Sequence, residues 1–257
     1  MPARKVYGLR PDPFDPRDLL FRKDWLRIGK FRQKLRAALL PQAVDLREEA
    51  NPPIYDQGNL GSCTANALAG VLGHVTADQG DGVALFSRLF LYGNARRWEP
   101  YDDGATLRDL MKGLDKYGVP LERMWPYDTA RWKDKPPQEV WDAAYHREAV
   151  DYYRLETLDG MRICLGQDHK PFIFGVMLYD SFKPDSDHSI PMPGPGERSQ
   201  GGHAMSCVGY DDRRKAFLVR NSWGEDWGDN GYCWMPYTYF QEPELFWDAW
   251  TVRSIPA

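Results

Sequence analysis

The sequence predicts an α+β fold of two lobes, in which a helical lobe packs against an antiparallel β lobe with a cleft between them. Helical periodicities come first, starting near residue 63, and strand-like segments follow after about residue 150. A chain whose helices precede its strands does not have the alternation of βαβ units. With 257 residues, 42% of them hydrophobic, it can fill a sizeable core. We expect the functional site in the cleft.

The chain divides into an extension and one main domain. Residues 1–43 are rich in proline and charge, and their second half, LRIGKFRQKLRAALL, is basic and compatible with a helix. We expect this extension to lie on the lobes and to cover part of the cleft, as an intramolecular regulator. Residues 44–257 form the domain, with the helical lobe to about residue 150 and the β lobe over 151–257.

The first helix is predicted to begin near Cys63 and to be buried on most sides. Ala65, Leu68, Leu72 and Val75 follow a helical period, and few charged residues flank them.

Further helices are predicted at FSRLFLYGNARRW, from residue 107, and near TLDGMRICLG. In the second of these, Thr106 and Asp109 form a capping arrangement, and Gly118 suits the end. Its apolar face consists of Leu107, Leu110, Met111 and Leu114.

Five later segments alternate or run apolar between Gly, Pro and Asp clusters and are predicted strands. They are PFIFGVML, HAMSCVGY, KAFLVRNSW, GYCWMP and DAWTVRS.

A hairpin joins the second and third of these strands. If its turn is centred near Asp212, antiparallel pairing sets His203 directly opposite Asn221, on one face. The same register places Met205 against Val219 and Cys207 against Phe217. A bulge or a one-residue slip would break this geometry.

Charge and composition exclude several classes. The net charge of −4 comes from 37 acidic and 33 basic residues mixed along the chain, so neither nucleic acid nor a membrane surface is a favoured partner. The four cysteines are widely spaced, which fits reduced thiols and a cytoplasmic protein. No metal site is expected, because His203 and Cys207 lie roughly 13 Å apart along a strand.

Cys63 is a candidate nucleophile. The backbone N–H groups and the dipole of a helix N-terminus favour a thiolate there, and a neighbouring imidazolium would lower the thiol pKa further. His203 could supply it, with the Asn221 oxygen fixing the ring. An oxyanion would be held by the Cys63 N–H and a side-chain amide such as that of Gln57.

Three segments resemble the papain-like cysteine peptidases. YDQGNLGSCTANA is similar to their active-site segment, GGHAMSCVGY to their histidine strand and VRNSWGEDWGDNGYCWM to their asparagine segment, in the same order. The resemblance runs with interruptions from about residue 42 to the C-terminus. It implies the two-lobed papain-like fold.

The resemblance also implies roles for individual residues. Cys63 would be the nucleophile, His203 its partner, Asn221 the orienting residue and Gln57 the oxyanion donor. Trp223 matches the indole that shields the histidine–asparagine bond from water.

Other positions relate to substrate. Gly104, in YDDGAT, takes the place of the glycine-rich stretch that holds substrate backbone, and Ala204, like Trp223, is expected to line the substrate site. Leu60 and Thr64 depart from the family, which has a disulfide cysteine and an aromatic residue at these positions in its secreted members.

The predicted function is hydrolysis of peptide bonds through a thioester acyl-enzyme, with a peptide or protein substrate and without a cofactor. Two alternatives stay open. The same Cys–His–Asn site could pass the acyl group to an amine, as a ligase or transpeptidase does, or the fold could serve a catalytically silent peptide-binding protein.

Overall fold

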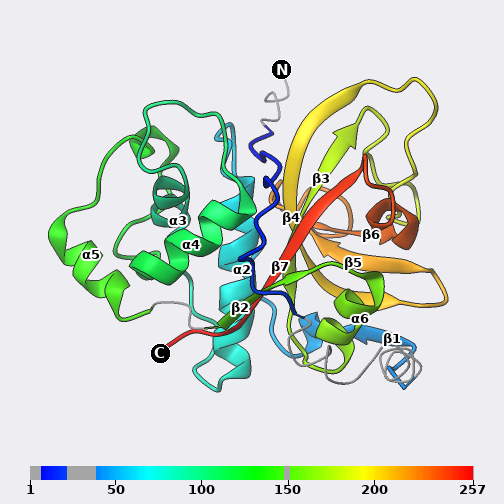
Figure 1. Cartoon of the computed structure of the whole chain (residues 1–257), viewed down its shortest axis with the longest axis horizontal. Coiled ribbons are helices and arrows are strands. Elements are labelled where there is room, and N and C mark those ends of the chain that lie inside the picture. The colour runs from blue at the N-terminus through cyan, green and yellow to red at the C-terminus, as the bar shows by residue number, and fades with distance from the viewer. Residues whose placement is uncertain (1–6, 22–38, 148–150, 257) are drawn as a thin grey trace.

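One lobe of the protein is a seven-stranded antiparallel sheet, and the other is a group of helices packed against one of its faces (Figure 1). The computed structural model of the chain describes residues 7–21, 39–147 and 151–256. The strands follow the order β2-β7-β3-β4-β5-β6, and β1 pairs with β4. Their bounds are β1 Ala43–Asp45, β2 Asp151–Leu155, β3 Phe172–Tyr179, β4 Ser199–Asp211, β5 Ala216–Arg220, β6 Tyr232–Pro236 and β7 Phe246–Ser254.

The predicted helices are confirmed. The structure has α2 Cys63–Asp78, α3 Arg88–Ala95, α4 Leu107–Tyr117, α5 Gln138–Tyr145 and α6 Leu158–Gly166, with short 3-10 turns at Leu46–Glu48, Thr129–Arg131 and Tyr237–Phe240. Thr106 caps α4 by accepting a bond from the Asp109 N–H, and Gly118 ends it at φ 66°. The predicted basic helix falls largely on residues 22–38, outside the described residues.

Helix α2 is the centre of the molecule, because every residue from Cys63 to Thr76 is buried. Side chains such as Leu68 and Leu72 are 0% exposed. A helix that is buried on all sides has no face turned to water, so it lies between the lobes. Its N-terminus, with Cys63, therefore reaches the seam where the lobes meet.

The two faces of the sheet serve two cores. Along β3, Phe172 and Phe174 belong to the core that lies on the α6 side, whereas Ile173 belongs to the core shared with α2. This alternation is the period of two of a strand buried on both faces.

The predicted register of the β4–β5 hairpin is wrong. Tyr210 pairs with Phe217, three residues further along β5 than predicted. Cys207 pairs with Val219, two residues further than predicted. The turn is longer than predicted, and a β-bulge at Val208 takes one position back. Because the net shift is two residues, His203 and Asn221 still share a face, as diagonal rather than direct neighbours.

Three elements were not predicted. Strand β1 joins the sheet before the chain enters the helical lobe, although residues from 44 onward had been assigned to the helical lobe. Strand β2 and helix α5 also lack a clear pattern: β2 is half exposed at the sheet edge, and only Val140 and Ala144 of α5 are buried. Short, half-exposed elements carry a weak periodic signal.

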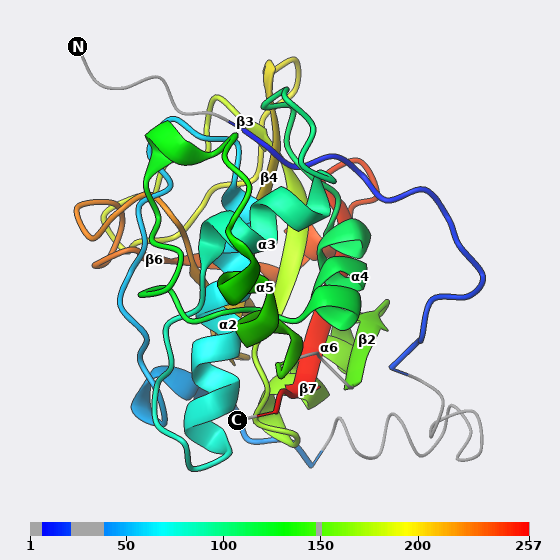
Figure 2. The same cartoon turned by 90° about the vertical axis from the view of Figure 1, so that its left-hand side faces the viewer.

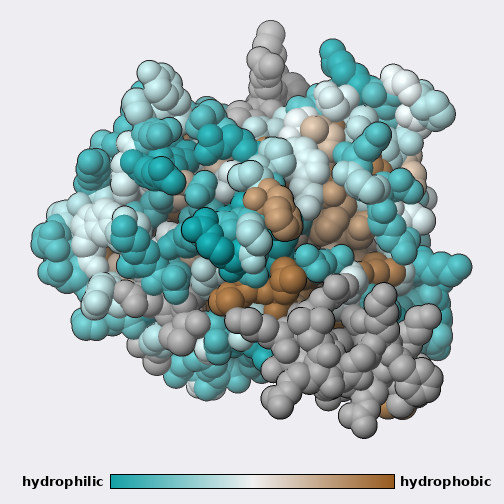
Figure 3. Space-filling model, viewed as in Figure 1, coloured by the Kyte–Doolittle hydropathy of each residue, from teal (hydrophilic) through white to brown (hydrophobic). Residues whose placement is uncertain are grey.

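Residues 7–21, which we call the strap, run across the seam between the helical lobe and the sheet (Figures 1 and 2). Leu9 forms a parallel bridge with Ala105 at one end, and Leu20 one with Arg154 of β2 at the other. Figure 3 shows apolar side chains gathered in this central band, on a face that is otherwise largely hydrophilic.

Replacing Leu68 by alanine should lower the free energy of unfolding by about 2–5 kcal/mol, because it leaves a cavity in the middle of α2. Urea denaturation measures the loss. The matched change Leu39→Ala, at a side chain that is 79% exposed, should cost less than about 0.5 kcal/mol. Equal losses at the two positions would contradict a core centred on α2.

Candidate active site

Cys63 is the first residue of α2 and is 0% exposed. Ser62, in the N-cap position, makes no side-chain capping bond. The backbone N–H groups of Cys63 and Thr64 instead hydrogen-bond to the Cys63 sulfur, together with those of Ala204 and Gly8. Backbone N–H groups that have no partner within the helix thus donate to the sulfur. The contact with Ala204 places the His203 segment of β4 beside the same atom.

His203 and Asn221 lie together as predicted. The His203 Nε2 is 2.8 Å from Asn221 Oδ1, and both residues are buried. Ser222 N–H also donates to Asn221 Oδ1, over 2.8 Å. Because that oxygen is held as an acceptor, Nε2 of His203 must carry the hydrogen, which assigns Nδ1 as the basic nitrogen of the neutral ring.

The Trp223 indole covers this pair. Its ring stacks on the His203 imidazole with a centroid distance of 4.7 Å and an interplanar angle of 27°. Tyr7 of the strap packs edge-on against both rings, at 6.2 and 6.3 Å. Aromatic rings therefore enclose the histidine–asparagine bond and keep the dielectric constant around it low.

Gln57 is buried in the loop that precedes Cys63. Its Nε2 donates to Leu60 O over 3.0 Å, and its Oε1 accepts from Ser222 Oγ over 2.7 Å. Its backbone N–H donates to Ser222 O. These contacts orient the amide and join the Cys63 loop to the segment that carries Asn221.

Gly104 lies against the strap rather than beside the catalytic pair. Its φ is +78°, and a Cβ at this position would come within 1.9 Å of Gly8 O. The next residue, Ala105, donates its N–H to Gly8 O and accepts from Arg10 N–H. Gly104 and Ala105 thus bind the backbone of the strap in the cleft, and only glycine fits at position 104.

The strap passes directly over the sulfur. A Cβ on Gly8 would lie 1.8 Å from Gly61 O, so the strap can approach only through a glycine. The Gly61 loop is fixed from the other side, because Asp102 accepts the Gly61 N–H at 3.1 and 3.0 Å. Leu9 N–H donates to Gly202 O, next to His203. The residues predicted to form the site are therefore gathered around an occupied cleft.

The expected low pKa of Cys63 is not found in this closed form. Burial raises the pKa of the thiol and outweighs the four backbone N–H donors, which lower it. The strap takes part in this environment through Gly8, whose backbone N–H is one of the four donors.

The remaining cysteines carry no second site. Cys164, Cys207 and Cys233 are free and buried, and burial raises the pKa of each. Within residues 7–21, 39–147 and 151–256, no cluster of three or more His, Cys, Asp or Glu side chains could hold a metal ion. In the same part of the chain no helix could span a membrane.

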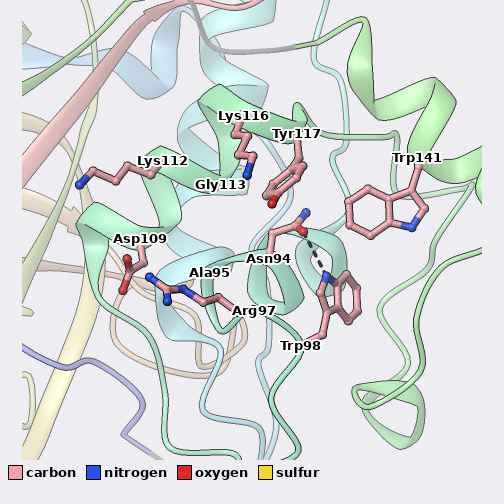
Figure 4. A pocket seen from close by; sticks show the side chains of 10 residues that line it. All are labelled: Asn94, Ala95, Arg97, Trp98, Asp109, Lys112, Gly113, Lys116, Tyr117 and Trp141. Atoms are coloured by element: carbon pink, nitrogen blue, oxygen red, sulfur yellow. Dashed lines mark hydrogen bonds between the residues drawn. The ribbon is translucent and has the colours of Figure 1, made fainter.

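A separate pocket of about 460 Å³ opens in the helical lobe, between α3, α4 and α5 (Figure 4). Trp98 and Trp141 face it, but both rings pack against Phe90. None of the cleft residues lines it. Its aromatic residues therefore belong to the core of the lobe.

Sequence reasoning missed Gly8, Leu9 and Asp248 in this region. Nothing local distinguishes Gly8 from any other loop glycine. Asp248 did carry a signal, since it is an acid inside the run FWDAWTV, but the strand was predicted to start at this residue. The structure starts β7 at Phe246 and buries Asp248, which is 2% exposed.

The comparisons with known proteins agree with this geometry. The family model described as papain family cysteine protease matches residues 40–242. An uncharacterized peptidase C1-like protein of Acanthamoeba polyphaga mimivirus is 34% identical over 94% of this chain and 84% of its own length. A cathepsin B-like protein, CP3, of Giardia intestinalis is 29% identical over 78% of this chain and 71% of its own.

Among solved structures, xylellain, a cysteine protease from Xylella fastidiosa, superposes with a TM-score of 0.86 and 36% identity. The match covers 98% of this chain and 97% of xylellain. The chain belongs to the papain family of cysteine proteases. It is a thiol hydrolase with the two-lobed papain-like fold.

The pH at which Cys63 reacts should fall when the strap is displaced. Displacing the strap should expose Cys63 to water and so reduce the burial that raises the pKa of its thiol. The contribution of the thiol proton to the stability of the closed form is therefore fully present below the open-form pKa of Cys63. It is lost as the pH rises through the higher closed-form pKa. Gly8→Ala should displace the strap, because the new Cβ clashes with Gly61 O. The apparent pKa of Cys63 alkylation should drop by about one unit or more.

Iodoacetamide labelling over a pH series, read by mass spectrometry, measures this pKa. Phe14→Ala is the matched control on the strap, since Phe14 is 85% exposed. Identical pH profiles for Gly8→Ala and the unaltered chain would mean that the strap does not govern the thiol.

Proposed function

We propose that this chain hydrolyses peptide bonds with Cys63 as the nucleophile and His203 as its acid–base partner. The observation that carries the proposal is the meeting of the α2 N-terminus with the His203–Asn221 pair. Cys63 receives backbone N–H bonds, one of them from Ala204, and His203 is fixed by Asn221 at 2.8 Å. These are the parts that thiol-based acyl transfer needs.

The proposed reaction has two halves. The Cys63 thiol passes its proton to Nδ1 of His203, the thiolate attacks the substrate carbonyl carbon, and the resulting oxyanion is held by the Cys63 N–H and the Gln57 amide. His203 gives its Nδ1 proton to the leaving amine, which leaves a thioester. His203 then takes a proton from water, the hydroxide attacks the thioester, and the acid and the thiolate are released.

Asn221 acts in this scheme by holding the ring. Asn221→Ala, made together with Gly8→Ala so that the cleft is open, should lower kcat about 10²-fold with little change in KM, because the ring loses its fixed orientation. Hydrolysis of a fluorogenic peptide measures both constants. Asn230→Ala is the control at an exposed asparagine. A loss confined to KM would argue for a binding role of Asn221 instead.

Hydrolysis and transfer to an amine share the same thioester, so the acceptor decides between them. With a peptide ester and an added amine, the Gly8→Ala chain should yield mainly the free acid. Liquid chromatography of the products measures the partition. A majority of the amide product would favour the ligase or transpeptidase. A folded chain whose Cys63 reacts with neither the ester nor a thiol-directed epoxide would favour the silent peptide-binding protein.

The strap is proposed as the intramolecular regulator. Support comes from its contacts with the site: Gly8 over the sulfur, Leu9 against Gly202, and Tyr7 against His203. It presents a backbone N–H, not a carbonyl carbon, to Cys63, so it blocks the nucleophile without being attacked. Substrate backbone would take its place, held by Gly104, Ala105 and Ala204 beside Trp223.

A further inference from the structure

The hydroxyl of Tyr127 joins the two segments that carry the oxyanion donors of the proposed reaction. It donates to Gln57 O over 3.0 Å and lies 2.5 Å from Ser62 Oγ. Gln57 supplies the side-chain amide, and the peptide bond from Ser62 to Cys63 carries the Cys63 N–H. One hydroxyl therefore bonds to both halves of the proposed oxyanion site.

The direction of the hydrogen bonds at this hydroxyl is fixed by its neighbours. Gln57 O is a carbonyl oxygen and can only accept, so the single Tyr127 hydrogen goes to it. The Ser62 hydroxyl must then donate to the Tyr127 oxygen. Asn66 Nδ2 donates to Ser62 Oγ over 3.0 Å, and Arg88 donates to Asn66 Oδ1 over 3.1 Å. The bonds form one chain that runs in one direction and ends on the backbone of Gln57, and bonds in such a chain strengthen one another.

Arg88, the first residue of α3, also fixes the Tyr127 ring. Its guanidinium lies over that ring, 4.0 Å from the centroid, and bonds to Glu122 over 2.7 Å. Glu122 in turn accepts the Tyr127 backbone N–H over 3.1 Å. The ring, the backbone and the hydroxyl of Tyr127 are thus held by separate contacts, so the hydroxyl has a defined position.

The Tyr127 hydroxyl stays protonated at neutral pH. Burial raises its pKa and outweighs the hydrogen bonds from Ser62 and Asn66, which lower it. A free tyrosine already titrates only near a pH of about 10. Tyr127 therefore acts as a fixed donor to Gln57 and not as an acid or a base.

Ser62 serves this chain instead of capping α2. A serine in the N-cap position commonly has an extended backbone and accepts an N–H of the first helical turn. Here Ser62 has φ −99° and ψ 21° and makes no such bond, because its hydroxyl is shared between Tyr127 and Asn66. A residue that gives up its usual structural bond indicates that its position is set by the site.

The backbone of Gln57 is held from both lobes. On the β side Ser222 O accepts the Gln57 N–H over 2.9 Å, and on the helical side Tyr127 donates to Gln57 O. Leu60 N–H also reaches Gln57 O, over 3.4 Å, from within the same loop. Tyr127 therefore ties this loop to the helical lobe across the base of the site.

We propose that Tyr127 is a positioning residue that sets the spacing between the two oxyanion donors, the Gln57 amide and the Cys63 N–H. The proposal rests on the peptidase function proposed above. Both donors must lie about 2.7–3.1 Å from the same oxygen atom, and a misplacement of about 1 Å can cost about 10²-fold in rate. Loss of the hydroxyl should therefore slow the formation of the oxyanion and leave substrate binding almost unchanged.

Tyr127→Phe removes the hydroxyl and keeps the ring that packs on Arg88. In the full-length Gly8→Ala chain it should lower kcat for a fluorogenic peptide about tenfold and leave KM within about twofold. Tyr239→Phe is the matched control, because Tyr239 OH donates to Met177 O over 2.7 Å within the β lobe. It should leave kcat within about twofold. An unchanged kcat with Tyr127→Phe, or an equal loss with Tyr239→Phe, would overturn the proposal.

A double-mutant cycle determines whether Tyr127 acts through Gln57. Gln57→Ala removes one oxyanion donor and should lower kcat about 10²-fold. Adding Tyr127→Phe should then lower kcat by less than about twofold, because spacing no longer matters when one donor is gone. A further tenfold loss would mean that Tyr127 supports the fold in general, and would overturn the proposal.

Two reactions of Cys63 separate this proposal from the peptidase function. Acylation by a peptide p-nitrophenyl ester passes through an oxyanion, whereas alkylation by iodoacetamide does not. In the Gly8→Ala chain, Tyr127→Phe should slow acylation about tenfold and leave alkylation within about twofold, as measured by mass spectrometry. This result with no cleavage of peptides would overturn only the peptidase proposal. Equal slowing of both reactions, or of neither, would overturn the positioning role.

Ser62→Ala cuts the same link from the other side, so the decision does not depend on the folding of Tyr127→Phe. It leaves Tyr127 bonded to Gln57 but removes the bond to the segment that carries the Cys63 N–H. Acylation should again slow more than alkylation. Equal effects on the two reactions would overturn the proposal.

Discussion

The position of the active site follows from the burial of α2. All residues of the helix from Cys63 to Thr76 are buried, so both lobes must cover it, and its first residue, Cys63, lies where the lobes meet. Strand β4 packs on the same helix and brings His203 and Ala204 to its N-terminus. Asn221, on the neighbouring strand end, then fixes the imidazole. The catalytic geometry is thus a result of packing around one helix.

The strap lies in the same seam between the lobes. The strap comes close to the sulfur because glycines lie on both sides of the contact. A side chain at Gly8 would collide with Gly61, and one at Gly104 would collide with Gly8. Further along, the Asp18 side chain, which is 5% exposed, bonds to both Arg108 and Arg154. These ion pairs connect the strap to α4 and to β2. The strap is therefore held at two places, by close backbone packing beside the sulfur and by ion pairs further along.

Much of this could be predicted from the sequence, for identifiable reasons. Helices α2 and α4 have strong periods and caps, and the His203–Asn221 pair survived a wrong register because the longer turn and the bulge at Val208 shift it by an even number of residues. Strand β2 and helix α5 were missed because their half-exposed surfaces carry little pattern. The raised pKa of Cys63 could not be predicted, because it follows from tertiary burial and from contacts with residues as distant in sequence as Gly8.

We infer that the strap holds a competent thiol peptidase closed. The most direct measurement compares the rate of peptide hydrolysis by the unaltered chain with that of Gly8→Ala and of Gly8→Ala combined with Cys63→Ala. Gly8→Ala should hydrolyse the peptide faster than the unaltered chain by about tenfold or more, and the double variant should be inactive. Equal rates for the unaltered and Gly8→Ala chains, or hydrolysis that persists without Cys63, would contradict it.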